Sequence, residues 1–285
     1  MIPVFVLSLA RTPERRASIC GQLEALHVPF TLVEAVDGKR LSEREMLTLA
    51  PRPRRLTLRW PLSKGQIGCA ASHRLAIKRI FDSGAAFGCV IEDDGEPHRT
   101  FPEFLDADWL ATLPRFDILK LAGDEASSRE MLAVPIARRA ERPVCVPLHP
   151  SYASRCYIVS RQGAARVLRR LRVIDDSSDV MIFRRPMTSM RFLDIRPCVV
   201  GMTGAESTLD ADRWHNAPAP WWRPLLSWLP HRLSLMERKV RRYLVFIRTL
   251  GFGGFRRIEI VPLELKHAAA ALKSQEGRQQ PLTAD

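Results

Sequence analysis

Several common sequence signals are missing from this 285-residue chain. Its cysteines form no C-x-x-C pair and have no zinc-finger spacing, which argues against a disulfide scaffold and a zinc-binding module. No apolar stretch approaches the ~20 residues that a membrane-spanning helix needs. We expect most of the thiols to be small buried side chains in a reducing compartment. The six cysteines are Cys20, Cys69, Cys89, Cys145, Cys156 and Cys198.

Nucleotide-binding and hydrolase fingerprints are missing as well. The glycines match neither a P-loop nor a Rossmann dinucleotide motif. No serine lies in a G-x-S-x-G elbow, which argues against an α/β-hydrolase. The short apolar run that opens the sequence has no basic residue before it, and Arg11, Glu14 and Arg15 follow closely, which does not fit a signal peptide. We therefore expect a cytoplasmic protein.

Acidic residues are scarce relative to basic ones, since 31 Asp and Glu against 44 Lys and Arg give a net charge of +13. Residues 213–285 hold 13 basic and 5 acidic side chains, a net of +8, whereas residues 1–212 carry only +5. Four prolines and four tryptophans also gather between residues 214 and 230. These shifts predict a main domain over residues 1–212 and a basic C-terminal extension over residues 213–285.

The first 212 residues alternate between strand-like and helix-like patterns. Helix starts are indicated by Pro13 at a first helical position and by the capping boxes Ser42 with Glu45 and Ser63 with Gln66. Strands alternating with helices predict an α/β sandwich with a mostly parallel sheet, in which ligands bind beyond the carboxyl ends of the strands. The apolar, β-favouring runs cover residues 4–9, 30–38, 87–91, 116–121 and 156–160.

The helix expected over residues 65–82 carries small side chains, among them Gly68, Ala70 and Ser72. Small side chains allow a close approach to a neighbouring strand or to a ligand. His73 follows them directly. A lone helical histidine is more often a packed or capping residue than a catalytic one, so this pattern is weak by itself.

Carboxylates gather at the end of one predicted strand, in VIEDDGE at residues 90–96. Three adjacent acids repel one another unless a positive group lies between them, and a divalent metal is the partner that we expect. In an extended segment, residues two apart point the same way. Glu92 and Asp94 could therefore converge on one ion, while Asp93 accepts hydrogen bonds from a ribose. The alternative is a solvated acidic turn.

Several stretches together resemble glycosyltransferase family 25, the bacterial lipooligosaccharide galactosyltransferases and their collagen-modifying relatives. The resemblance covers residues 3–212 in the family's order and approximate spacing. The matching segments are VFVLSLARTPERR, the EAVDG turn, LSKGQIGCAASHRLAIKRI, the EDD motif, CYIVSRQGAARVL and SSDVMIF.

The resemblance implies a GT-A-like enzyme with a single Rossmann-type α/β/α sandwich. Such an enzyme would move a hexose from a UDP-sugar to a glycolipid or oligosaccharide acceptor, and galactose is the hexose that we expect. The setting would be the synthesis of lipooligosaccharide, lipopolysaccharide or a related surface glycan, and the transfer would invert the anomeric centre.

The resemblance also implies Mn²⁺ or Mg²⁺ held by Glu92 and Asp94, with Asp93 beside the UDP-sugar. The metal would neutralise the charge that builds on the departing UDP. Arg15 and Arg16 could add positive charge near the phosphates, or could simply face solvent at a helix start. The residues that the resemblance places around the donor pocket are Arg11, Asp37, Gly38, Gly65, Ser72 and His73.

An inverting transfer needs a carboxylate to take the proton of the attacking hydroxyl. Asp179 falls at the aspartate of the family's Pro-Val-Asp motif, although Ser177 and Ser178 stand where the family has Pro-Val. Because of this departure, Asp176 or Asp175 could take the role instead. All three could also be simple loop acids.

The C-terminal extension has the pattern of a helix that lies on a membrane surface. Residues 233–250 place Leu235, Val240, Leu244 and Ile247 among basic side chains, each of which contributes about 1 kcal/mol near an anionic leaflet. We expect peripheral contact with the anionic inner-membrane leaflet, which would bring the enzyme to its acceptor. The alternative is a basic helix whose apolar stripe packs on the catalytic domain.

Two other classes of function remain open on the sequence. The pI of 10.2 suggests a nucleic-acid-binding module. That class needs an organised basic patch with base-contacting or stacking groups, whereas the tail pairs its charges with tryptophans typical of lipid interfaces, so no nucleic-acid partner is expected. The other class is a non-catalytic tether that binds a UDP-sugar without turning it over.

Overall fold

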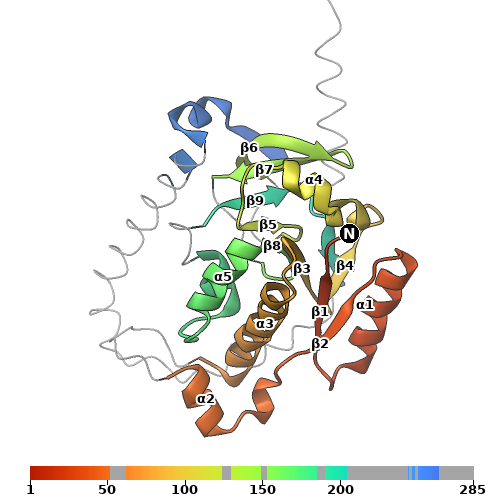
Figure 1. Cartoon of the computed structure of the whole chain (residues 1–285), viewed down its shortest axis with the longest axis vertical. Helices are drawn as coiled ribbons and strands as arrows, with labels where there is room; N and C mark the ends of the chain where they lie inside the picture. The colour runs from red at the N-terminus through yellow and green to blue at the C-terminus, as the bar shows by residue number, and fades with distance from the viewer. Residues whose placement is uncertain are drawn as a thin grey trace, which may run out of the picture.

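The structure of the protein is a computed structural model that describes residues 1–51, 62–123, 130–148, 153–184, 190–203, 243, 246–247 and 250–262. In these residues a central sheet lies between two layers of helices (Figure 1). The α/β class and the Rossmann-like layering expected from the sequence are confirmed.

The described part of the chain forms one sheet of nine strands and a smaller sheet of two. Six of the nine strands share one direction, in line with the predicted mostly parallel sheet. The other three, β7, β8 and β11, run the opposite way, so five of the eight neighbouring pairs are antiparallel. The order across the sheet is β11 (Glu259–Pro262), β6 (Glu130–Arg139), β7 (Arg142–Pro147), β9 (Phe192–Ile195), β5 (Ile118–Lys120), β8 (Cys156–Ser160), β3 (Phe87–Glu92), β1 (Val4–Ser8) and β2 (Thr31–Glu34).

Three of the helices begin where the sequence predicts. Ser42 and Ser63 each complete a capping box with the residue three positions later, and Pro13 is the first residue of its helix. The two-stranded sheet pairs β4 (Gly95–Pro97) with β10 (Val200–Met202). The α-helices are α1 (Pro13–Ala25), α2 (Glu43–Leu49), α3 (Lys64–Asp82), α4 (Ala107–Thr112) and α5 (Arg161–Arg170).

The alternation of side chains along the strands divides the core into two halves. In β1, Val4 and Val6 face the half that α1 and α4 cover, whereas Phe5 and Leu7 face the half that α3 and α5 cover. In β3, Cys89 and Ile91 likewise point to one half and Val90 to the other. Strands buried on both faces read as continuous apolar runs, which is why the sequence shows these two strands so clearly.

Strand β1 is the point at which the order of the strands reverses. Its neighbours are β2 on one side and β3 on the other, and both pairings are parallel. The chain reaches β2 through α1 on one face of the sheet and returns to β3 through α3 on the opposite face. In open α/β sheets, ligands bind in the crevice that such a reversal leaves at the carboxyl ends of the strands.

Helix α3 lies very close to the loop that follows β2. A Cβ atom on Gly68 would stand 2.6 Å from the carbonyl oxygen of Val36 and 2.7 Å from the backbone nitrogen of Gly38. A Cβ atom on Gly38 would in turn stand 1.9 Å from the carbonyl oxygen of Lys64. The small residues that the sequence places on this helix therefore serve a backbone-to-backbone contact.

Part of the C-terminal extension belongs to the packed domain. Strand β11 adds to the edge of the sheet against β6. Phe246 is 2% exposed within the hydrophobic core, and Leu250, Phe255 and Ile258 pack against it. At these residues the extension packs on the domain, which is the alternative to contact with a membrane surface. Leu235, Val240 and Leu244 lie outside the described residues, and no described helix is long and apolar enough to cross a membrane.

Replacement of Phe246 by alanine should lower the free energy of unfolding by about 3 kcal/mol, because it removes a fully buried ring and leaves a cavity. Phe252 supplies the control, since it is 78% exposed and its replacement by alanine should cost no more than about 0.5 kcal/mol. Urea unfolding of the full chain measures both values. Equal losses in the two variants would show that the extension does not pack on the domain.

Replacement of Gly68 by alanine should destabilise the protein by about 1 kcal/mol or more, because the new methyl group meets two backbone atoms. Helix propensity alone predicts a gain of about 1 kcal/mol for the same change. Gly21 in α1 has no atom within 4 Å of an added Cβ, so Gly21→Ala should show that gain. Thermal unfolding of both variants tests the opposite signs, and a stabilised Gly68→Ala protein would contradict the close contact.

Candidate functional site

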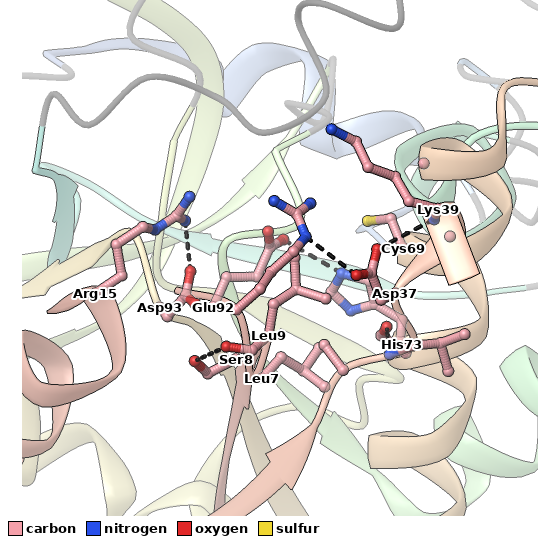
Figure 2. A pocket seen from close by; sticks show the side chains of 16 residues that line it. Leu7, Ser8, Leu9, Arg15, Asp37, Lys39, Cys69, His73, Glu92 and Asp93 are labelled. Carbon is pink, nitrogen blue, oxygen red and sulfur yellow. Dashed lines mark hydrogen bonds and ion pairs between the residues drawn. The ribbon is translucent and has the colours of Figure 1, made fainter. Parts of the chain in front are cut away.

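A pocket opens at the carboxyl ends of β1, β2 and β3, where the strand order reverses (Figure 2). Its empty volume is about 660 Å³, with the open solvent at its mouth included. The residues that line it are Leu7, Ser8, Leu9, Arg11, Arg15, Ala35, Val36, Asp37, Gly38, Lys39, Gly65, Cys69, Ser72, His73, Glu92 and Asp93.

The loop after β2 forms one wall of this pocket. The Asp37 carboxylate accepts a hydrogen bond from the backbone N–H of Lys39 at 3.1 Å and pairs with Arg11 Nε at 3.2 Å. Ser72 supports the loop from α3, because the backbone N–H of Val36 donates to its Oγ at 2.8 Å. That hydroxyl donates in turn to a carbonyl one turn earlier in α3. Asp37 and Arg11 therefore face the pocket, while Ser72 holds its wall.

Glu92 is the last residue of β3, and its carboxylate accepts hydrogen bonds from two other parts of the chain. Its Oε1 accepts hydrogen bonds from Ser154 Oγ at 2.8 Å and from His73 Nε2 at 3.2 Å. His73 is fully buried in α3, and its Nδ1 lies 3.1 Å from the hydroxyl oxygen of Tyr157 in β8. The histidine therefore links the acid motif, residues 92–94, to the core of the sheet.

The charges of His73 and Glu92 support each other. Burial acts against a charged imidazole, but Tyr157, Cys69 and Glu92 outweigh it and raise the pKa of His73 well above its usual range. Burial also acts against the ionised carboxyl of Glu92, and the hydrogen bonds from His73 and Ser154 still hold its pKa below the usual range. Both pKa shifts favour a charged imidazole beside an ionised carboxylate.

Asp93 points away from Glu92 and towards α1. Its Oδ1 forms an ion pair with Arg15, and its Oδ2 lies 3.3 Å from Thr12 Oγ1, which donates to it. The side chain is only 9% exposed. Figure 2 shows Arg15 and Asp93 on the opposite side of the site from His73. Arg15, which the sequence left between a phosphate contact and a plain surface residue, is a partner of the acid motif.

Asp94 is flanked by two arginines but hydrogen-bonded by neither. Its Oδ2 lies 3.6 Å from Arg15 Nη2, its Oδ1 lies 3.6 Å from Arg155 Nε, and Oδ1 is buried without a hydrogen-bond partner. Burial and then the nearby charge of Glu92 raise the pKa of Asp94 to about 6, against the effect of both arginines. This carboxyl lacks a sufficient positive partner of its own.

Glu92 and Asp94 do not share an extended strand, so the prediction that they point the same way from one strand is wrong. Strand β3 ends at Glu92, and Asp93 and Asp94 form the turn into β4, so the two-residue alternation stops there. In the described part of the chain, no three His, Cys, Asp or Glu side chains come together as a metal centre. A cation held largely by ligand phosphates needs only one or two carboxylates, and the unpartnered oxygen of Asp94 fits that requirement.

Of the three candidate bases, Asp179 lies close enough to the acid motif for the charge of Glu92 to act on it. Burial, followed by the charge of Glu92, raises the pKa of Asp179, and its Oδ1 is buried without a hydrogen-bond partner. Asp176 is buried and accepts a hydrogen bond from the backbone of Ser177 at 2.9 Å. Asp175 is exposed on the surface.

Most of the residues expected at the donor pocket do line one pocket. Arg11, Asp37, Gly38, Gly65, Ser72, His73, Glu92 and Asp93 all do so, whereas Asp94 and the three candidate bases do not. Sequence reasoning missed Ser154, Arg155 and Tyr157, which lie next to the motif because β8 pairs antiparallel with β3. The segment CYIVS signalled a strand, but no pattern in it indicated which strand would be its neighbour.

Comparisons with known proteins agree with the sequence resemblance. The family model "Glycosyltransferase family 25 (LPS biosynthesis protein)" matches residues 1–182. The probable inactive glycosyltransferase 25 family member 3 of Rattus norvegicus is 29% identical over 195 residues, 64% of this chain and 33% of the relative. Procollagen galactosyltransferase 2 of Homo sapiens is 25% identical over 200 residues, 66% of this chain and 31% of the relative.

The chain spans about a third of the length of these curated relatives. Among solved structures, a mannose-1-phosphate geranyltransferase from Thermus thermophilus aligns with a TM-score of 0.36 and 11% identity over 68% of this chain and 73% of that one. That likeness is too low to carry an argument, whereas the family model covers more than half of this chain. The chain belongs to glycosyltransferase family 25.

Proposed function

We propose that the protein is a metal-dependent hexosyltransferase that moves galactose from UDP-galactose to a saccharide acceptor with inversion. Membership of glycosyltransferase family 25 and relatives named procollagen galactosyltransferases support the transfer of a hexose. The description of the matching family as an LPS biosynthesis protein supports a lipopolysaccharide or lipooligosaccharide acceptor, or a related surface glycan. The observation that carries the proposal is the pocket at the strand reversal with the acid motif at its edge.

The nucleotide end of the donor would occupy the pocket beside the loop after β2. Leu7, Leu9 and Val36 supply apolar surface there, and Asp37 supplies a hydrogen-bond acceptor at the side. Gly38 and Gly65 also line this wall. The diphosphate would then extend along Glu92 and Asp93 towards Asp94, at the positive side chains of α1.

Asp94 and Glu92 are the residues that would hold Mn²⁺ or Mg²⁺ together with the phosphate oxygens. Bound there, the metal would act as a Lewis acid and neutralise charge on the departing diphosphate. His73 and Ser154 fix the orientation of Glu92, and a residue that orients a metal ligand commonly strengthens metal binding.

Asp179 is the proposed general base. Its raised pKa makes it a stronger proton acceptor than an ordinary aspartate, and its buried Oδ1 has no hydrogen-bond donor to compete with the acceptor hydroxyl. Asp176 is the alternative candidate, and its carboxylate accepts a hydrogen bond from the backbone N–H of Ser177 at 2.9 Å.

A second candidate function is a tether that binds the nucleotide-sugar without turnover. Relatives at 28–30% identity carry names that describe them as inactive or probably inactive. In addition, each of the three acids already faces a cationic side chain, from His73, Arg15 or Arg155. Binding of UDP-galactose without release of UDP or transfer would identify this function.

The experiment that tests the main proposal is a panel of nucleotide-sugars assayed for UDP release with and without Mn²⁺. We expect UDP-galactose to be used in preference to UDP-glucose and GDP-sugars, and only with the metal. Release that is equal in the presence of a chelator would contradict metal dependence. Preference for a non-uridine donor would contradict the donor assignment.

Replacement of Asp94 by asparagine should reduce UDP affinity in the presence of Mn²⁺ at least tenfold, equivalent to about 1.4 kcal/mol, because the metal loses a carboxylate ligand. Calorimetric titration with UDP measures the change. Asp108→Asn, at an exposed position in α4, is the matched control and should bind as the unmodified protein does. Unchanged titration in the Asp94 variant would contradict the metal role.

The acceptor is proposed to be a glycolipid or oligosaccharide at the cytoplasmic face of the inner membrane, which the basic extension would contact. Replacement of Arg241 and Arg242 by glutamate should then weaken co-sedimentation with anionic vesicles at least tenfold. Arg169, in α5, and Arg172, just after it, are exposed and serve as the control. Their replacement by glutamate changes the net charge by the same amount and should weaken vesicle binding less. Equal effects, or tighter binding to DNA than to vesicles, would defeat the membrane contact.

A further inference from the structure

Arg155 is fixed beside the acid motif by the backbone of the sheet. It directly precedes β8, the antiparallel neighbour of β3. Its carbonyl oxygen accepts a hydrogen bond from the backbone N–H of Glu92 at 2.8 Å. The position of its Cα is therefore set by the same strand pairing that delivers the acids, and its side chain starts next to them.

The guanidinium of Arg155 is largely buried yet poorly satisfied. Its side chain is 15% exposed, and its Nε and Nη1 are buried without hydrogen-bond partners. Nη2 donates to the thioether sulfur of Met202 at 2.9 Å, and thioethers are weak acceptors. Buried charged donors are normally paired, so a guanidinium in this state is costly unless another group completes it.

Asp94 does not complete it. The separation of 3.6 Å between Arg155 Nε and Asp94 Oδ1 exceeds that of a hydrogen bond, and Oδ1 is itself without a partner. On the other side of Asp94, Arg15 also has an unpartnered buried Nε. Two arginines thus face one carboxylate, and each has a buried donor without a hydrogen-bond partner.

A ligand that satisfies these groups must offer several anionic oxygens at once. Phosphate groups match the planar fork of an arginine, and two of them in a row can meet two arginines at once. The donor pocket ends at Arg15 and Asp93, next to Asp94. Asp94 and Arg155 therefore lie beside the end of the pocket at which the diphosphate of a nucleotide-sugar would arrive.

We propose that Arg155 binds the diphosphate of the donor, opposite Arg15, and that its contact with Asp94 is the arrangement of the site without donor. This inference rests on the proposed function. During transfer, the bond between the anomeric carbon and the diphosphate oxygen breaks, and its electron pair stays on that oxygen. The acceptor oxygen forms the new bond to the anomeric carbon and gives its proton to Asp179. Arg155 donates to the diphosphate as this charge develops.

The test is the affinity of Arg155→Gln for UDP and for uridine, by calorimetry and NMR titration respectively, with Mn²⁺ present. UDP affinity should fall at least tenfold, because charge-assisted hydrogen bonds to the phosphates are lost, while uridine affinity should change less than twofold. Arg155→Lys should recover part of the loss. Arg139→Gln is the control and should bind both ligands normally. It removes an arginine of β6 that pairs with Asp106.

Two results would overturn the inference. One is unchanged UDP affinity in Arg155→Gln, and the other is an equal loss of UDP and uridine affinity, which would mean that Arg155 only supports the fold. If the unmodified protein binds no UDP, the proposed function fails, and inorganic pyrophosphate becomes the probe. Binding of pyrophosphate that Arg155→Gln loses would then support Arg155, and no binding by either protein would overturn it.

Discussion

The structure depends on one electrostatic constraint: three adjacent carboxylates at the end of a buried strand need separate positive partners. Glu92 receives His73 from α3, Asp93 receives Arg15 from α1, and Asp94 faces Arg155 from the start of β8. These partners come from helices on opposite faces of the sheet and from a neighbouring strand. The acid motif therefore ties the layers of the sandwich together at the place where ligands enter. It also explains how a chain with a net charge of +13 keeps an acidic site.

The three partnerships differ in quality, and the difference points to function. The pairs at Glu92 and Asp93 have close contacts, whereas Asp94 has no hydrogen bond on Oδ1 and its pKa rises to about 6. A buried group without a good partner is costly, so such a group in a folded protein commonly marks a ligand site. The poorly satisfied carboxylate and the poorly satisfied guanidinium of Arg155 lie side by side. The phosphates of a donor would pair with the guanidinium, and the cation bound to them would pair with the carboxylate.

Much of the fold could be predicted because its signals are local. The buried strands β1 and β3 read as apolar runs, and the capping boxes at Ser42 and Ser63 start α2 and α3 where the structure has them. The position of the acids at a strand end was also predictable. The pairing of β8 between β3 and β5, and the addition of β11 to the far edge, could not be predicted, because strand pairing depends on contacts between residues far apart in the sequence.

The sequence by itself determined the α/β class, the family and the place of the acid motif, since composition, periodicity and motif order are properties of the chain alone. Only the tertiary structure decided which side chain each acid meets. Asp93 and Asp94 lie in a turn where strand alternation ends, and Arg155 reaches Asp94 across an antiparallel pair. Electrostatic partners are set by distance in space, and a linear pattern does not contain that distance.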